Sequence, residues 1–327
     1  MRSMPNSRGG NQRRAGSQCA SAVLMVCPAT FGHNAETAAS NAFQNEAAES
    51  PEFLRAAARG EARDLALALE AAGIAVHLAD DVEQPACPDA VFPNNWLSFH
   101  ADGTVVLYPM LAPNRRLERR EALVAEACER LGFVERRRID LREHERAGRF
   151  LEGTGSLVLD HVQRVAYAAL SARTDRGLVE EWARRMDYEP LCFEARDERG
   201  EPYYHTNVLL WIGTRAAVLC AEALPAPDRE RVRARLRASG RELLEIDRAL
   251  VRAFAGNLLE LEWRDEEEGS GTVLAMSSTA RAALPSGLVR HLQAAVDSVV
   301  DVPVPTIERV GGGSVRCMLA EVPVRRP

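Results

Sequence analysis

Three residues in this chain have side chains suited to nucleophilic chemistry. Cys317 follows three consecutive glycines, which give a thiol an open neighbourhood and let backbone N–H groups approach a ligand. His205 is a candidate general acid and base, and Glu152 stands before Gly-Thr-Gly at an expected strand start. A cysteine, a histidine and a glutamate together suit attack on an sp² carbon, with proton transfer to a departing amine.

These residues belong to polar clusters that recur along the chain. The clusters lie roughly 50 to 60 residues apart, and each carries glycine, asparagine, glutamate or histidine. In a closed repeat architecture, equivalent positions of successive repeats come together, so we expect one residue of each cluster near a common centre. The five residues are Asn95, Glu152, His205, Asn257 and Cys317.

Each of these residue types also has a structural interpretation. A lone cysteine is usually a small buried hydrophobe. Four other cysteines are assigned to that class: Cys27, Cys128, Cys192 and Cys220. An isolated histidine is often a hydrogen-bonded structural residue, and a glutamate at a strand start is often solvated or a cap. The repeat spacing and the glycines before Cys317 favour the chemical interpretation at the three residues named first.

The elements that must position these residues also recur. Amphipathic helices are expected to begin near Glu52, Arg115, Asp175, Ala226 and Ser286. Each is followed by a short strand-like run: Ala75–Leu78, Val134–Leu141, Pro190–Phe193, Leu243–Ile246 and Val302–Ile307. Two more strand-like runs precede most helices, such as Ala90–Phe99 and Thr104–Tyr108 around a turn at Asp102–Gly103.

The repeating unit is therefore strand, strand, helix, strand. Val23–Cys27 is the first strand, and the tail 311–324 supplies another strand that could complete the first unit. About five such units at a period near 60 residues indicate a closed repeat architecture, with strand ends converging on an axis where a site would form.

Composition excludes several classes of function. All 41 basic residues are arginine, so a Schiff-base lysine, pyridoxal phosphate held in the usual way, a Walker-type loop and a protein-kinase site are excluded. The net charge of -6 argues against a nucleic-acid partner. No CxxC, HxH or HExxH motif occurs, so we expect neither a metal nor another cofactor.

The first 20 residues are expected to form a disordered tail before a single catalytic domain at 21–327. They are polar and basic and lead into a short apolar run, so a signal peptide is the alternative. No apolar run approaches 18 residues, and we expect no membrane segment. Seven cysteines at long spacings form no disulfide framework, and free thiols favour a cytoplasmic location.

The ordered set of motifs resembles the pentein superfamily, which contains arginine deiminases, dimethylarginine dimethylaminohydrolases and amidinotransferases. The resemblance covers residues 23 to about 324 and is nearest the citrulline ureidase branch. Its markers are Phe92-Pro-Asn-Asn-Trp96, Leu107-Tyr-Pro-Met110, Asn114-Arg-Arg-Leu-Glu-Arg119, Leu151-Glu-Gly-Thr-Gly155, Leu170-Ser-Ala-Arg-Thr-Asp175, Tyr204-His-Thr-Asn207 and Gly311-Gly-Gly-Ser-Val-Arg-Cys-Met318.

The resemblance implies a five-bladed α/β propeller of β-β-α-β units with a central site. It implies Cys317 as the covalent nucleophile, His205 as general acid and base, and Glu152 as the hydrogen-bonding carboxylate. Arg173 matches an arginine that grips a substrate carboxylate, a task suited to a fork-shaped guanidinium. Arg116 is assigned to the same end of the substrate. The choice between it and Arg115 stays open, as does the role of Asn257.

The deiminases have aspartate where this chain has Asn95 and Asn207, which we assign with Phe92 to the substrate site. Two carboxylates suit a cationic guanidinium, whereas amides offer both donors and acceptors to a neutral ureido group. We therefore expect a hydrolase of the citrulline ureido C–N bond that forms ornithine, ammonia and carbon dioxide.

The alternatives are a deiminase or dihydrolase acting on arginine, an amidinotransferase, and a non-catalytic propeller that binds a macromolecule. A non-catalytic propeller would not need the Cys317, His205 and Glu152 set that this chain carries. The expected partner is a small amino acid, with no nucleic acid and no membrane, and a homo-oligomer is compatible with the sequence.

Overall fold

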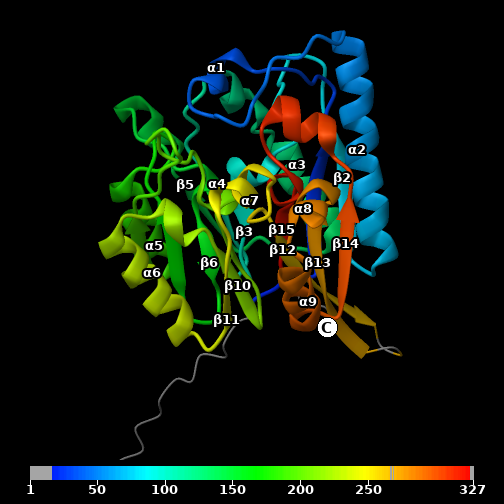
Figure 1. The fold of residues 1–327 in the computed structure, drawn as a ribbon. Helices are drawn as coiled ribbons and strands as arrows, with labels where there is room; N and C mark the ends of the chain where they lie inside the picture. Colours follow the sequence, from blue (N-terminus) through cyan, green and yellow to red (C-terminus); the bar gives the residue numbers. More distant parts are fainter. Residues whose placement is uncertain (1–16, 266, 268, 325–327) are drawn as a thin grey trace, which may run out of the picture.

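Five three-stranded sheets are arranged around one axis (Figure 1). The computed structural model describes residues 17–265, 267 and 269–324. In order across each sheet, the strands are β15 (Ala320–Val322), β1 (Ala22–Cys27) and β2 (Ala75–Asp80); β3 (Leu97–Phe99), β4 (Thr104–Leu107) and β5 (Arg137–Asp140); β6 (Val158–Asp160), β7 (Val165–Ala169) and β8 (Glu189–Phe193); β9 (Leu210–Ile212), β10 (Ala216–Leu219) and β11 (Glu242–Glu245); β12 (Leu259–Asp265), β13 (Gly269–Ser277) and β14 (Ser298–Val302).

Every sheet has the same internal pattern. Its middle strand runs antiparallel to one neighbour and parallel to the other, as β4 does between β3 and β5. The middle strands β1, β4, β7 and β10 are buried along their whole length, which explains their continuous runs of apolar residues. In the first blade β15 pairs antiparallel with β1, so the C-terminal strand closes the ring. The five-bladed α/β propeller is confirmed.

Helices cover the outside of the blades, and the first strands of neighbouring blades, such as β6 and β9, pack together near the axis. The helices are α1 (Ala35–Ala38), α2 (Pro51–Ala71), α3 (Glu121–Leu131), α4 (Gly153–Ser156), α5 (Arg176–Met186), α6 (Ala226–Ala238), α7 (Arg248–Arg252), α8 (Ser278–Ala283) and α9 (Ser286–Ala295). In α5, apolar residues on one face are buried and Asp175 caps the N-terminus, so the amphipathic pattern and the cap agree.

Three expected boundaries need correction. The second helix begins at Glu121 rather than near Arg115, because residues 114–118 form a separate 3₁₀ turn. The expected strand Ala90–Phe99 is reduced to Leu97–Phe99, because Pro93 starts a 3₁₀ turn ahead of it. The expected strand Val302–Ile307 is shifted to Ser298–Val302, and prolines at 303 and 305 end its pairing.

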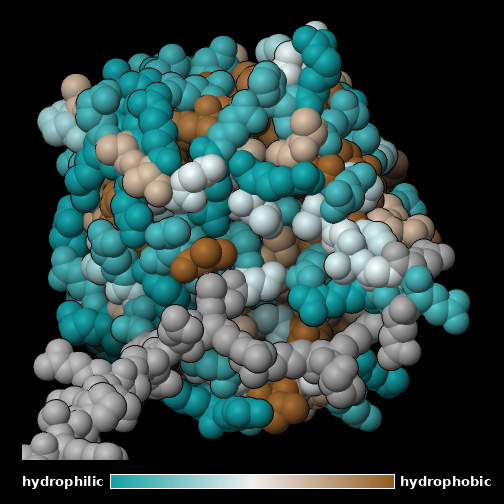
Figure 2. Space-filling view, turned by 90° about the horizontal axis from the view of Figure 1, so that it is seen from below, coloured by the Kyte–Doolittle hydropathy of each residue, from teal (hydrophilic) through white to brown (hydrophobic). Residues whose placement is uncertain are grey.

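The start of the folded chain lies before residue 21. Residues 1–16 of the expected disordered tail lie outside the described residues, but Gln18, Cys19 and Ala20 are buried. The amide of Gln18 donates to the carbonyls of Leu159 and Ile212 at 3.0 and 3.2 Å, which ties it to two blades. In the view from below, hydrophilic residues dominate the surface that grey atoms leave uncovered (Figure 2).

Candidate active site

The polar clusters lie at one end of the first strand of each blade. Short helical turns at η1 (Pro93–Asn95), α4, η4 (Thr206–Val208) and η7 (Val315–Met318) lead directly into β3, β6, β9 and β15. Asn257 stands in the same place before β12. The repeat spacing therefore brings five distant segments together around the axis, as the sequence predicts.

The thiol of Cys317 is buried and surrounded by amide groups. Only 3% of the residue is exposed. Its Sγ lies 3.3 Å from Nδ2 of Asn257 and 3.7 Å from Nδ2 of Asn207. The Nδ2 groups of both amides can donate to the sulfur, and the Oδ1 atoms of Asn257 and Asn207 lie 3.7 and 3.9 Å from it.

The sequence places Asn257 near the common centre but assigns it no role. Its Oδ1 accepts the backbone N–H of Arg316 at 3.1 Å, and its Nδ2 donates to the carbonyl of Asn207 at 3.0 Å. Because it is fully buried and binds the residue before Cys317, it fixes the thiol relative to the neighbouring blade. Its regular spacing is the signal that could have assigned it.

Glu152 and His205 form a buried pair. Nε2 of His205 lies 2.9 Å from Oε2 of Glu152, and the other carboxylate oxygen accepts the backbone N–H of Leu111 at 3.0 Å. An ionised carboxylate requires a donor at Nε2, which assigns the ring proton to that nitrogen. Nδ1 is buried without a hydrogen-bond partner among the described residues. Its lone pair is therefore available to take a proton.

Burial and nearby charge set the protonation of this pair. Burial alone would raise the pKa of Glu152, but the guanidinium of Arg173 and the hydrogen bond from His205 outweigh it and hold the pKa at about 2. Burial lowers the pKa of His205 to about 4, against the opposing effect of Glu152. At neutral pH the carboxylate is ionised and the imidazole is neutral, so the imidazole can act as a base.

Two glycines allow these side chains to approach closely. A Cβ at Gly155 would lie 2.6 Å from Nδ2 of Asn95 and 2.6 Å from Nδ1 of His205. Gly153 has a φ of +48°, and a Cβ there would lie 2.1 Å from the carbonyl oxygen of Asn94. The Glu152-Gly-Thr-Gly155 run therefore has its glycines where a side chain would collide with the site.

Arg173 joins the site but is held by another segment. Residues 34–45, which we call the strap, cross the top of the molecule in Figure 1 and include α1. Nη2 of Arg173 donates to Oγ of Ser40 at 2.8 Å and to the carbonyl of Thr37 at 3.1 Å, while Nη1 lies 3.4 Å from Oε2 of Glu152. A substrate carboxylate could bind the Arg173 guanidinium only if it replaced the contacts with Ser40 and Thr37.

Arg115, and not Arg116, is the arginine of the centre. Arg115 is 2% exposed, binds Glu118 through two hydrogen bonds of 2.9 and 3.0 Å and donates to Oδ1 of Asn95 at 2.8 Å. The carboxylates around it raise its pKa despite burial. Arg116 instead binds the carbonyls of residues 110 and 111 and lies 3.4 Å from Glu145, away from the thiol. The assignment of Arg116 is corrected for this geometric reason.

Phe92 and Asn95 both line the cavity that contains Cys317. The Phe92 ring packs so closely that a Cβ at Gly313 would lie 2.9 Å from it. Oδ1 of Asn95 is occupied by Arg115, and Nδ2 donates to Oδ1 of Asn94 at 2.9 Å. One N–H of the Asn95 amide is left for a ligand.

The cavity also contains a carboxylate that the sequence analysis missed. Asp89 is 2% exposed, and its Oδ1 is buried without a partner in the described part of the chain. Its Oδ2 accepts from Asn34 on the strap at 2.7 Å. The cavity measures about 10 Å³, roughly the room for one water molecule, so an amino acid can enter only after the strap moves. Among residues 17–265, 267 and 269–324, no group of His, Cys, Asp or Glu side chains could hold a metal ion.

Comparison with protein families agrees with this arrangement. A family model described as "N,N dimethylarginine dimethylhydrolase, eukaryotic" matches residues 27–324. No curated protein matches the chain.

Solved structures share the fold at low sequence identity. The substrate-bound N-terminal domain of ArgZ, an arginine dihydrolase of cyanobacteria, is 19% identical, with a TM-score of 0.68 over 92% of this chain and 97% of that domain. Unliganded AgrE is 21% identical, with a TM-score of 0.69 over 93% of this chain. A dimethylarginine dimethylaminohydrolase is 16% identical, with a TM-score of 0.59 over 91% of this chain and 97% of that one. The apo structure of ArgZ contains a longer chain than the N-terminal domain, and this protein covers 41% of it. It covers 40% of the AgrE chain.

Proposed function

The chain belongs to the N,N-dimethylarginine dimethylhydrolase family of the pentein superfamily, and we propose that it hydrolyses the ureido C–N bond of citrulline. The family consists of hydrolases that act on C–N bonds. The substrate and the roles of individual residues are the proposal. The products would be ornithine, ammonia and carbon dioxide.

The hydrogen bonds that Glu152 already accepts are the strongest support for a neutral substrate group. Its two oxygens already accept from His205, Arg173 and the backbone of Leu111, and Nη1 of Arg115 lies 3.9 Å away. Among the described residues, the side chains that hydrogen-bond the sulfur are amides. A ureido carbonyl needs donors, whereas a guanidinium needs a carboxylate that is not already neutralised by arginine.

The proposed reaction proceeds through a thioester. The thiol of Cys317 gives its proton to Nδ1 of His205 as the sulfur attacks the ureido carbon, and Nδ1 then passes this proton to the departing amine, while Nε2 remains bound to Glu152. Water then attacks the carbamoyl thioester while Nδ1 of His205 accepts its proton, and the C–S bond breaks with its electron pair returning to sulfur. One solved ArgZ structure contains a covalently bound reaction intermediate, which supports covalent chemistry in a protein of this fold.

Two buried charges suit the amino-acid end of citrulline. Arg173 can form paired hydrogen bonds with the α-carboxylate once Ser40 and Thr37 release it. The unpartnered Oδ1 of Asp89 lines the same cavity and can accept from the α-ammonium group. The pair would orient the substrate with its ureido end toward Cys317.

The second candidate is an arginine dihydrolase. The observation in its favour is the fold shared with ArgZ and AgrE, the second of which was solved in complex with arginine. In that case Glu152 would have to release Arg173 to meet a guanidinium.

Assays with citrulline, arginine and methylated arginines, with all products identified, separate the two candidates. We expect kcat/KM for citrulline to exceed that for arginine by at least about a hundredfold, roughly 2.7 kcal/mol. Asn95→Asp should erode the ratio, because it adds a charge that a ureido group cannot use. Faster turnover of arginine by the wild-type protein would refute the citrulline proposal. Cys317→Ala is the inactive control for covalent chemistry.

The remaining expectations about context stay predictions. We propose a small amino acid as the only ligand, without a nucleic-acid or membrane partner, and a homo-oligomer remains compatible. No helix in the described part of the chain is long and apolar enough to cross a membrane. The cytoplasmic location rests on the free cysteines alone.

A further inference from the structure

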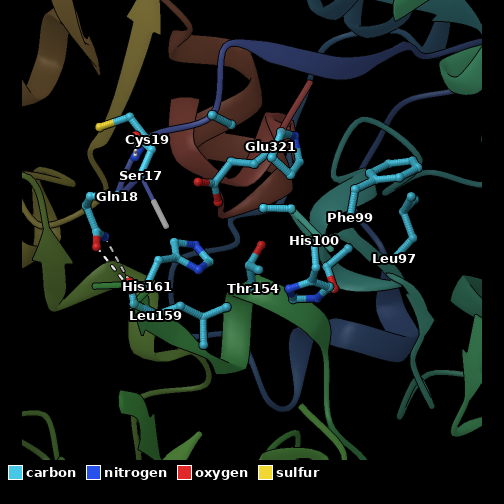
Figure 3. A pocket seen from close by; sticks show the side chains of 14 residues that line it. Ser17, Gln18, Cys19, Leu97, Phe99, His100, Thr154, Leu159, His161 and Glu321 are labelled. Atoms are coloured by element: carbon cyan, nitrogen blue, oxygen red, sulfur yellow. Dashed lines mark hydrogen bonds between the residues drawn. The ribbon is translucent and has the colours of Figure 1, made fainter. Parts of the chain in front are cut away.

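Two neighbouring cavities that share lining residues lie among the first strands of the blades. Their volumes are about 40 and 30 Å³, and strands from all five blades line them. Figure 3 shows the side chains of Thr154, His161 and Glu321 converging on the larger one. Both cavities are lined by the same five residues: Gln18, Thr154, Leu159, His161 and Glu321. We call the pair the axial cavity.

The axial cavity reaches from the surface to the residues that hold the nucleophile. One end is lined by Ser17, which is exposed, and by Pro323. The other end is lined by Asn207 and Arg316. Asn207 contacts Sγ of Cys317 at 3.7 Å, so one residue borders both the axial cavity and the thiol.

The smaller cavity, of about 30 Å³, is the inner cavity, and its polar groups require water. The indole N–H of Trp211 and Oε1 of Glu260 are both buried without a partner among the described residues, and both side chains line this space. One is a donor and the other an acceptor, so a water molecule can satisfy both at once, whereas an ammonium ion could satisfy only the carboxylate. Buried groups of this kind are normally paired with ordered water, and cavities of 30 to 40 Å³ hold a few molecules.

We propose that the axial cavity supplies the hydrolytic water to Cys317 while the strap closes the substrate side. The inference rests on the proposed thioester chemistry. The substrate-side cavity, at about 10 Å³, has little room for water around a bound ligand. The axial cavity is too narrow for an amino acid but wide enough for water, so it separates the path of the water from that of the substrate.

The chemical step served by this path is the second one. A water molecule that passes Asn207 adds to the carbamoyl carbon, gives one proton to His205, and displaces the thiolate of Cys317 as the C–S bond breaks. Carbamic acid is released and divides into ammonia and carbon dioxide. No oxidant, metal or further reactant is needed.

Filling the axial cavity should slow this step alone. Leu159 lines both of its parts, so Leu159→Trp should close it. In rapid-quench experiments with citrulline, we expect ornithine to be released in a burst at the wild-type rate, followed by steady turnover about tenfold slower, with carbamoylated Cys317 accumulating in intact-mass spectra. Val162→Trp is the matched control, because Val162 is exposed and lines neither part.

A second variant keeps the proposal testable if Leu159→Trp does not fold. Thr154→Val keeps the shape of a side chain that lines both parts but removes its hydroxyl, and it should give a smaller accumulation of the thioester. Equal deacylation rates in wild type, Leu159→Trp and Thr154→Val would overturn the inference while leaving the hydrolase intact. Absence of any Cys317 adduct in every variant would instead overturn the proposed function.

Hydration of the axial cavity can be measured without turnover. A high-resolution crystal structure of the unliganded protein should show ordered water between Trp211 and Glu260. A dry inner cavity would contradict the proposal, whatever the kinetics show.

Discussion

Sγ of Cys317 contacts the amides of Asn207 and Asn257 and has no charged side chain among its hydrogen-bonding partners in the described chain. Thiolates at reactive sites are often stabilised by a cation or a helix N-terminus. Here, neutral N–H donors are in the corresponding position. The reactivity of the thiol should therefore depend on the two asparagines.

Asn257→Asp tests that dependence. The substitution keeps the shape of the side chain but removes the N–H that lies 3.3 Å from sulfur and adds a negative charge. We expect alkylation of Cys317 by iodoacetamide at neutral pH to slow by about tenfold or more, because the sulfur loses an N–H donor and faces a negative charge. Peptide mass spectrometry at several pH values measures this. An unchanged alkylation profile would contradict a role for Asn257 at the thiol.

The pair of Glu152 and His205 makes stability depend on pH. In the folded protein the pKa of His205 is about 4, below its usual 6.5, so between these values only the unfolded chain binds the proton. The free energy of unfolding should therefore fall as pH is lowered from about 6.5 to about 4, by roughly 3 kcal/mol from this group. Glu152, with a pKa of about 2, extends the loss below pH 4.5.

Urea unfolding at pH 7.5 and pH 4.5 measures the effect. His205→Asn should reduce the loss of stability between the two values. His291→Asn, at an exposed position, serves as the control and should leave the loss unchanged. Equal losses in wild type and His205→Asn would contradict the assignment of a buried neutral histidine.

Among the elements, α4 leaves no room for larger side chains at its two glycines. It is a single helical turn of Gly153–Ser156 that places Glu152 beside His205. All four of its residues are buried. An added methyl group at Gly155 must displace both the imidazole of His205 and the Asn95 amide, because each would lie only 2.6 Å from it.

Gly155→Ala should therefore damage catalysis more than folding. We expect kcat/KM for citrulline to fall by about a hundredfold or more, with a loss of stability of about 1–3 kcal/mol. Steady-state kinetics and thermal unfolding measure the two. Gly287→Ala in α9, where the added methyl group meets no atom within 4 Å, should leave both near the wild-type values. Full activity of Gly155→Ala would show that these close contacts do not constrain the site.

At the scale of the whole molecule, one buried ion pair joins neighbouring blades. Arg241, just before β11, binds Asp160 at the end of β6 through hydrogen bonds of 2.6 and 3.1 Å. Its guanidinium also donates to Oε1 of Gln18, in the N-terminal segment, at 3.3 Å. The contacts connect three parts of the chain that are far apart in sequence.

Arg241→Leu should destabilise the protein by about 3–5 kcal/mol, because it leaves the carboxylate of Asp160 buried and unpaired. Activity per folded molecule should persist at low temperature, since these residues are outside the catalytic cavity. Chemical denaturation measures the loss. Arg237→Ala, whose side chain is 62% exposed, should change the stability by less than about 0.5 kcal/mol. Equal losses of stability in the two variants would contradict a larger contribution of the buried Arg241–Asp160 pair.

Much of the fold could be predicted from sequence, because the pattern is local and repeated. Helices α5, α6 and α9 begin within one residue of their expected starts, since their apolar spacing and first-turn residues agree. Boundaries failed where a proline or a 3₁₀ turn interrupts an apolar run, as at residues 90–96 and 303–307. Periodicity does not report such local breaks.

The sequence by itself determined that Asn95, Glu152, His205, Asn257 and Cys317 would meet, because a fixed period in a closed repeat brings equivalent positions to one axis. Only the tertiary structure decided between Arg115 and Arg116, gave Asn257 its contact with sulfur, and placed the strap on Arg173. The physical reason is that side-chain direction, burial and pairing across blades depend on segments 20 to 60 residues or more apart, which no local pattern encodes.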